Sequence, residues 1–185
     1  MPGSITLITG GMFAGKTEEL ARRIERVRIV SQMGRTERAI VFKPTRDTRR
    51  ERAGERMDPV RVERPADILP LAEGYTVVGI DEPHFWNEPE EAEEVRRVCL
   101  ALARGGTEVL VSVLNADFRG RPFLVGGLLF AIATDIVLRN AVCTACGADA
   151  SFSQRVAGGQ DTLQVGNGDA YRPCCVRCFK DPPTA

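Results

Sequence analysis

The sequence predicts an α/β fold in which an open parallel sheet carries helices on both faces. Two observations predict it. Short apolar, β-branched runs alternate with segments of helical periodicity over the first 140 residues, a pattern typical of parallel sheets whose strands are joined by helices. The run TVVGID at 76–81 is almost continuously apolar, as expected for a strand that is covered on both faces. Ligands of such sheets bind beyond the carboxyl ends of the strands.

The expected elements follow one another along the chain. Strands are expected at residues 5–8, 38–42, 76–81, 107–114 and 134–139. The first helix starts near Lys16, and Gly34 is a suitable stop for it. Asn87 is expected to cap the second helix and Gly105 to end it. The apolar face of this second helix is expected to be buried and consists of Ala92, Val95, Val98, Cys99 and Leu102.

A glycine-rich segment, TGGMFAGKT, follows the first strand. It fits the strand–GxxxxGK[ST]–helix arrangement of a P-loop, whose backbone N–H groups surround phosphate oxygens at a helix N-terminus. Lys16 would add a charge at the β/γ-phosphates, and the Thr17 hydroxyl is a ligand for Mg²⁺. Lysine is rare among the 25 basic residues, so its presence here indicates a need for a compact ammonium. The expected phosphate-binding residues are Thr9, Gly10, Gly11, Met12, Phe13, Ala14, Gly15, Lys16 and Thr17.

Two carboxylates end the strand at 76–81. Asp81 fits the acid that holds Mg²⁺ directly or through water, and Glu82, expected to point the other way, is a candidate general base toward an acceptor hydroxyl. Because the P-loop and these acids both lie at carboxyl ends of strands, we expect them to converge. His84 is the only histidine; imidazole titrates near neutral pH, which permits a catalytic role, whereas a lone histidine is more often structural.

The segment at 44–58, PTRDTRRERAGERMD, is dense in charge and almost free of large apolar side chains. It is therefore not expected to bury itself. Two interpretations remain open, a mobile surface loop and a lid over the phosphates.

Length and composition limit the remaining possibilities. The 185 residues give room for one good core and a small appendage, so we expect an α/β domain at 1–140, a small cysteine-rich domain at 141–180 and a flexible tail at 181–185. The formal net charge is zero, and no global field attracts nucleic acid or membrane. The longest apolar run is too short to span a bilayer. No signal peptide is visible, which predicts a cytoplasmic protein with reduced thiols.

Two CxxC pairs predict a metal site formed by Cys143, Cys146, Cys175 and Cys178. This spacing lets both thiolates of a pair reach one tetrahedral Zn²⁺ at about 2.3 Å, and four cysteines leave no open position, so the ion would be structural. The stretch between the pairs is longer than in a zinc ribbon and would form a loop fixed at its base by the metal. A redox role for CxxC is the alternative. Cys174 is a possible substitute for Cys175.

Five motifs together resemble the cellular-type (type II) thymidine kinases. These are TGGMFAGKTEEL, KPTRDTR, GIDEPHFW, NADFRGRPF and the paired CxxC. The P-loop alone is generic, but the series is specific and runs from the first strand to Cys178. The resemblance implies a P-loop NTPase-like fold with a C-terminal zinc-binding lasso. It also implies that ATP, with Mg²⁺, donates its γ-phosphate to the 5′-hydroxyl of thymidine, giving dTMP and ADP for the salvage of DNA precursors. Deoxyuridine is the second candidate acceptor.

The resemblance also implies roles for individual residues. Glu82 matches the catalytic base of the family, and the segment with Asp47 and Arg49 would lie near the phosphates and the sugar. Asp81 and His84 would belong to the ATP and Mg²⁺ site. Phe118 would pack on the thymine ring. The other residues expected around the nucleoside are Met12, Leu114, Ser153, Thr162, Leu163, Gln164, Val165, Gly166 and Tyr171.

Some residues depart from the family pattern. His84 stands where the family usually has Gln, Asn115 replaces a common Asp, and no histidine follows the segment with Asp47. The resemblance suggests a homotetramer and feedback inhibition by dTTP. The zero net charge predicts no nucleic-acid or membrane partner. The rival interpretations are a nucleic-acid-acting ATPase with a zinc module, a non-catalytic nucleotide sensor and a kinase for another nucleoside. The sequence does not separate thymidine from deoxyuridine.

Overall fold

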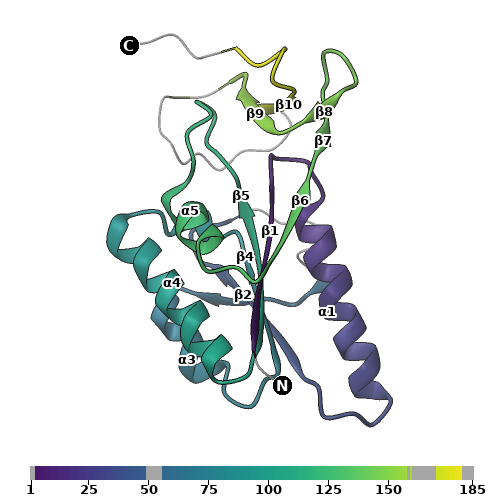
Figure 1. The fold of residues 1–185 in the computed structure, drawn as a ribbon, viewed down its shortest axis with the longest axis vertical. Coiled ribbons are helices and arrows are strands. Elements are labelled where there is room, and N and C mark those ends of the chain that lie inside the picture. Colours follow the sequence, from purple (N-terminus) through teal and green to yellow (C-terminus); the bar gives the residue numbers. More distant parts are fainter. Residues whose placement is uncertain (1–2, 49–55, 158, 160–169, 181–185) are drawn as a thin grey trace.

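The computed structural model describes residues 3–48, 56–157, 159 and 170–180. Within them a six-stranded sheet runs in the order β3-β2-β4-β5-β1-β6, and all its neighbouring strands are parallel (Figure 1). The strands are β1 Ser4–Gly10, β2 Ala39–Pro44, β3 Val60–Val62, β4 Val77–Asp81, β5 Glu108–Leu114 and β6 Asp135–Arg139. The expected parallel α/β sheet is therefore confirmed.

Helices cover both faces of the sheet (Figure 1). On one side lies α1 Lys16–Gln32; on the other lie α3 Ile68–Leu71, α4 Pro89–Arg104 and α5 Leu124–Phe130. Two 3₁₀ turns, η1 Pro65–Asp67 and η2 Pro83–Phe85, precede α3 and α4. The buried face of α4 is the one that its periodicity predicts, namely Ala92, Val95, Val98, Cys99 and Leu102. Apolar side chains form one core cluster under α1 and a larger one under α4 and α5.

The predicted cap of α4 is wrong. The helix is preceded by Glu88 in an extended conformation, and Pro89 occupies its first turn. Asn87 instead accepts a hydrogen bond at Oδ1 from the backbone N of Val125, at 3.4 Å, and so connects this turn to α5. The short elements β3, α3 and α5 were not expected, because periodicity does not identify elements of so few residues.

The segment at 44–58 is more buried than its composition suggests. The side chain of Asp47 is fully buried and Met57 is 1% exposed. Met57 packs with Leu20 and Ile24 in the cluster under α1, and the Arg28 guanidinium donates a hydrogen bond to the Met57 carbonyl at 2.6 Å. The expectation that this segment does not bury itself is therefore wrong for both ends. Residues 49–55 lie outside the described residues, so the choice between loop and lid stays open.

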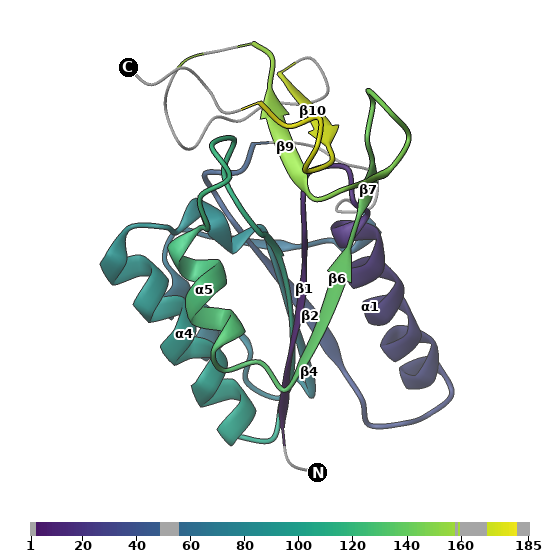
Figure 2. The same cartoon turned by 45° about the horizontal axis from the view of Figure 1, so that its top comes forward.

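The C-terminal region lies beyond the carboxyl ends of β1 and β6 (Figure 2). Its strands are β7 Ala141–Val142, β8 Asp149–Ala150, β9 Phe152–Arg155 and β10 Tyr171–Cys174. They form two antiparallel pairs, β7 with β8 and β9 with β10. A small cluster of Ala141, Cys143, Ala150 and Cys175 packs against Ala14 of the P-loop. This packing fixes the region directly over the glycine-rich segment.

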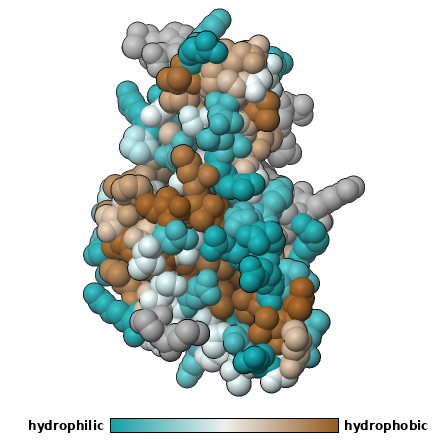
Figure 3. Space-filling model, turned by 45° about the vertical axis from the view of Figure 1, so that its right-hand side comes forward, coloured by the Kyte–Doolittle hydropathy of each residue, from teal (hydrophilic) through white to brown (hydrophobic). Residues whose placement is uncertain are grey.

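The surface of the main domain is mixed in polarity. The edge strand β6 leaves Ile136 41% and Leu138 61% exposed, and Figure 3 shows apolar areas among hydrophilic ones on one face. Among the described residues, every helix is too short or too polar to traverse a bilayer. The tail at 181–185 lies outside the described residues.

Candidate active site

The P-loop connects β1 to α1 and depends on two glycines. Gly10 has φ 147°, and a Cβ there would lie 2.0 Å from the backbone oxygen of Arg139 on β6. Gly15 has φ 74° and precedes the first residue of α1. Residues with a side chain rarely adopt these backbone conformations. Glycine at these two positions therefore permits the turn that brings backbone N–H groups toward a ligand.

The P-loop side chains converge with the end of β4, as the sequence predicts. Lys16 is 6% exposed and donates a hydrogen bond from Nζ to the Gly11 carbonyl at 2.7 Å. Thr17 Oγ1 donates to Asp81 Oδ1 at 3.3 Å, and Asp81 is fully buried. A hydroxyl beside a carboxylate at a P-loop offers the oxygen ligands that Mg²⁺ takes, so this pair fits the ion that the family resemblance implies.

Glu82 follows Asp81 in a left-handed conformation, with φ 61°. Its backbone N donates to the Ser112 carbonyl at 2.9 Å, and its Oε2 lies 3.5 Å from Nε2 of His84. The imidazole of His84 is 2% exposed and lies 4.8 Å from the ring of Phe85 and 5.1 Å from that of Phe123. Strained backbone of this kind recurs at functional sites. Here it occurs at the residue directly after Asp81, the carboxylate suited to binding Mg²⁺.

Sequence reasoning missed Lys43, which ends up in this site. Its ammonium lies 2.8 Å from Asp47 Oδ2 and 4.0 Å from Asp81 Oδ2, and its side chain is 4% exposed. The structure therefore brings Asp47 to the same place as Asp81, as the resemblance implies. Arg49 lies outside the described residues. Two signals for Lys43 were present in the sequence, the scarcity of lysine and its place at the start of the motif KPTRDTR.

Ser153 joins the C-terminal region to the P-loop. Its Oγ accepts a hydrogen bond from the backbone N of Met12 at 2.9 Å, and both residues are buried. Leu114, at the end of β5, is 9% exposed. These three residues, expected around a nucleobase, lie at the same end of the sheet. Residues 162–166, expected to contact the same ligand, lie outside the described residues.

Arg155 connects two further residues expected at the nucleoside. Its guanidinium carbon lies 3.7 Å from the centroid of the Phe118 ring, and its Nη2 donates to the Tyr171 hydroxyl at 2.6 Å. Phe118 is 4% exposed, and the guanidinium of Arg119 also lies over its ring, at 4.3 Å. Sequence reasoning missed Arg155, because only the pairing of β9 with β10 places it beside Tyr171.

Replacing Ser153 with Ala is expected to destabilise the protein by about 1–3 kcal/mol, because the buried Met12 amide loses its acceptor. Ser151→Ala is the matched control, since no hydrogen bond of the Ser151 hydroxyl occurs among the described residues. Denaturant unfolding of the zinc-loaded proteins measures the difference. Ser153→Thr keeps the hydroxyl and should recover much of the loss. Equal stability of the two alanine variants would remove this link between the P-loop and β9.

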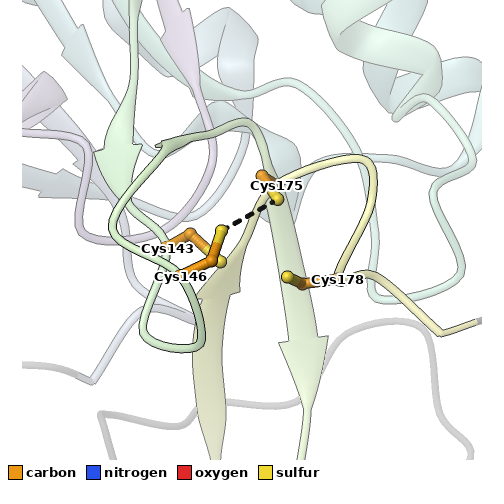
Figure 4. Close-up of side chains that lie close together, drawn as sticks. All are labelled: Cys143, Cys146, Cys175 and Cys178. Carbon is orange, nitrogen blue, oxygen red and sulfur yellow. Dashed lines mark hydrogen bonds between the residues drawn. The ribbon is translucent and has the colours of Figure 1, made fainter.

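The four paired cysteines form a cluster (Figure 4). Cys143 and Cys146 follow β7, and Cys175 and Cys178 follow β10; the four sulfurs lie within 4.8 Å of one another, with 3.6 Å between Cys146 and Cys175. Zinc bonds of about 2.3 Å in a tetrahedron require sulfurs about 3.8 Å apart. The arrangement therefore fits a structural zinc. Cys174 is outside this cluster, which answers the choice between Cys174 and Cys175.

The electrostatics of the cluster also fit a cation. Hydrogen bonds from backbone N–H groups, chiefly that of Cys175, lower the pKa of Cys143 to about 6. The Cys178 amide similarly lowers the pKa of Cys175. By contrast, the pKa of Cys178 rises to about 12, mainly because its thiol hydrogen-bonds to Cys146 and Cys175. Sulfurs this close do not all ionise without a positive charge among them, and a bound metal supplies one.

A parallel sheet that ends in a P-loop and a buried carboxylate defines the class of P-loop nucleotide-binding proteins. Comparison with known families narrows this class. The family described as Thymidine kinase matches residues 3–179, so the chain belongs to the thymidine kinase family.

Curated relatives named "Thymidine kinase" agree with this assignment. The relative from Rhodothermus sp. (strain ITI 518) is 36% identical, over 99% of this chain and 84% of its own. The relative from Chloroflexus aurantiacus (strain ATCC 29366 / DSM 635 / J-10-fl) is 36% identical, over 96% and 95%. That from Porphyromonas gingivalis (strain ATCC 33277) is 36% identical, over 96% and 85%. The similarity therefore extends over nearly the whole chain.

Proposed function

We propose that this protein transfers the γ-phosphate of ATP to the 5′-hydroxyl of thymidine, giving dTMP and ADP. The observation that carries the proposal is the hydrogen bond between Thr17 and Asp81. It joins the phosphate-binding loop to the strand end that is followed by Glu82. Donor phosphates, metal ligands and a base for the acceptor thus share one edge of the sheet.

The P-loop residues bind the donor. Backbone N–H groups from Gly10 to Thr17 surround the phosphates, and the ammonium of Lys16 leaves the Gly11 carbonyl to contact the β- and γ-phosphates. Thr17 and Asp81 would hold Mg²⁺, which supplies charge neutralisation between the β- and γ-phosphates when it is bound. Asp47, Arg49 and His84 complete the proposed ATP and Mg²⁺ site.

Glu82 acts as the general base. It takes the proton of the 5′-hydroxyl as the oxygen attacks the γ-phosphorus and the bond from that phosphorus to the β–γ bridging oxygen breaks, releasing ADP. This role is worth about 10²–10⁴-fold in rate. The imidazole of His84, 3.5 Å from the Glu82 carboxylate and packed against aromatic rings, limits the movement of that carboxylate. The Asp81 carboxylate accepts a hydrogen bond from the Thr17 hydroxyl, whereas that of Glu82 lies beside His84, so one acid serves the metal and the other the hydroxyl.

The nucleoside binds between the carboxyl end of the sheet and the C-terminal region. Met12, Leu114 and Ser153 line the base pocket, and Tyr171 closes the sugar side. Phe118 stacks on the thymine ring once the Arg155 guanidinium, which lies 3.7 Å from the centroid of the Phe118 ring, moves aside. Residues 162–166, which lie outside the described residues, would add hydrogen bonds from their backbone. Ser153, a small hydroxyl residue, would face the methyl group of the thymine ring.

The zinc bound by the four cysteines has a structural role. It fixes the base of the lasso at 141–180 on the P-loop α/β kinase domain at 1–140, through the contacts around Ala14. The working enzyme is a cytoplasmic homotetramer in nucleoside salvage for DNA synthesis, and dTTP inhibits it by feedback. The exposed apolar side chains of the edge strand β6 support self-association.

The deciding experiment measures ADP release from Mg²⁺·ATP with each deoxynucleoside in turn, and with single-stranded DNA as a separate sample. We expect release with thymidine, less with deoxyuridine, and none with DNA. Product dTMP is identified by mass. ATP consumption that DNA stimulates and no nucleoside does would reject the proposal in favour of a nucleic-acid-acting ATPase. ADP release with another nucleoside and not with thymidine would support a nucleoside kinase with a different substrate.

A further inference from the structure

Lys43 lies on β2 close to Asp81, the carboxylate suited to binding Mg²⁺. Phe42 of β2 pairs with Ile80 of β4, so the next residues, Lys43 and Asp81, stand at one level of the sheet. Side chains at one level of parallel strands point to the same face. This face is the one that α1 covers, where Thr17 donates to Asp81.

The ammonium of Lys43 lies close to two buried carboxylates. Asp47 Oδ2 is 2.8 Å away and Asp81 Oδ2 is 4.0 Å away, and both acids are 0% exposed. Buried carboxylates are costly unless a positive charge or hydrogen bonds compensate them. The Lys43 ammonium therefore compensates part of the negative charge of both carboxylates.

The hydroxyl of Ser112 lies on the neighbouring strand, on the other side of Asp81. Ser112 of β5 pairs with Asp81 in register, so its hydroxyl is at the same level and on the same face. The side chain is fully buried, and its Oγ has no hydrogen-bond partner within the part of the chain that the structure describes. The level thus offers carboxylate and hydroxyl oxygens, which are ligands for hard divalent cations, together with one ammonium.

We infer that Lys43 is a positioning residue that serves as the built-in counter-cation of Asp47 and Asp81, and so makes divalent-metal binding depend on the nucleotide. The inference rests on the proposed function only in taking Asp81 as the Mg²⁺ carboxylate. The positive charge of the ammonium opposes a free divalent cation at these carboxylates, which therefore hold it weakly; the phosphates of a nucleotide supply the missing attraction. Without the ammonium, the carboxylates have one positive charge fewer and attract a free divalent cation.

The test is Mn²⁺ binding to the zinc-loaded protein without nucleotide, measured from the electron paramagnetic resonance signal of free Mn²⁺. Lys43→Met is expected to bind one Mn²⁺ per chain about tenfold or more tightly than the wild type, because a unit positive charge near the ion is removed. Lys43→Arg should resemble the wild type. Lys180→Met, at an exposed lysine, is the matched control and should change nothing.

A second variant separates this role from a purely structural ion pair. Adding Asp47→Asn to Lys43→Met should abolish the new Mn²⁺ site, because one of its carboxylates is gone. A folded Lys43→Met protein that binds Mn²⁺ no better than the wild type overturns the inference. Should Lys43→Met not fold, Asp47→Asn is tested alone. It removes the carboxylate that lies 2.8 Å from the Lys43 ammonium, so the ammonium acts more strongly on Asp81 and should weaken Mn²⁺ binding to the ADP complex. Unchanged Mn²⁺ binding there also overturns the inference.

The metal titration is independent of nucleoside phosphorylation. A protein that gains the Mn²⁺ site in Lys43→Met but phosphorylates no nucleoside would reject the proposed function and leave the role of Lys43 intact. A wild type that makes dTMP, with a Lys43→Met variant that gains no Mn²⁺ affinity, would do the reverse.

Discussion

Glu82→Gln is expected to lower turnover by about 10²–10⁴-fold, equivalent to roughly 3–5 kcal/mol of activation free energy, while ATP binding stays near the wild-type value. Gln has nearly the same shape as Glu but accepts no proton. The phosphate contacts come from the P-loop and from Thr17 and Asp81, which the substitution leaves in place. The loss should therefore fall on kcat and leave the KM for ATP almost unchanged.

The measurement is steady-state ADP release together with ATP affinity from equilibrium binding. Glu90→Gln is the matched control, because Glu90 is an exposed carboxylate in the first turn of α4, a few residues away. It removes the same charge without touching the proposed site and should keep full turnover. A Glu82→Gln enzyme with near-wild-type kcat would exclude Glu82 as the base.

Cys146→Ser is expected to release the zinc and to weaken thymidine binding more than ATP binding. Structural zinc sites of this kind contribute about 10–16 kcal/mol of binding free energy, so the loss of one of four thiolates removes much of the affinity. Cys175 directly follows β10, which carries Tyr171 and pairs with β9, the strand of Ser153. Without the metal these strands lose their anchor, and the KM for thymidine should rise about tenfold or more, equivalent to about 1.4 kcal/mol or more.

Zinc content per chain and the two KM values measure this effect. Cys174→Ser is the matched control, because Cys174 adjoins Cys175 in the chain but lies outside the four-sulfur cluster; it should keep one zinc and the wild-type KM for thymidine. Loss of zinc from Cys174→Ser but not from Cys146→Ser would show that the ligand set is wrong. Unchanged thymidine affinity after zinc removal would exclude the lasso as part of the nucleoside site.

Much of this protein is determined by sequence alone, wherever the signal is local. The P-loop, the acids at the end of β4 and the buried face of α4 are all short patterns with fixed spacing. The four cysteines are likewise recognisable because CxxC places two sulfurs on one ion. The convergence of Thr17 with Asp81 was also predictable, because parallel strands present their carboxyl ends at one edge.

The tertiary structure alone decided what depends on partners far apart in the chain. Asn87 has the side chain of a helix cap, but it binds the backbone of Val125. Asp47 and Met57 belong to a charged segment, yet both are buried, because Lys43 offers Asp47 a counter-charge and α1 offers Met57 an apolar surface. Lys43 meets Asp81 through the register of β2 with β4. Composition and periodicity report the average environment of a segment, whereas a buried charge is stable only beside a particular neighbour, and the fold supplies that neighbour.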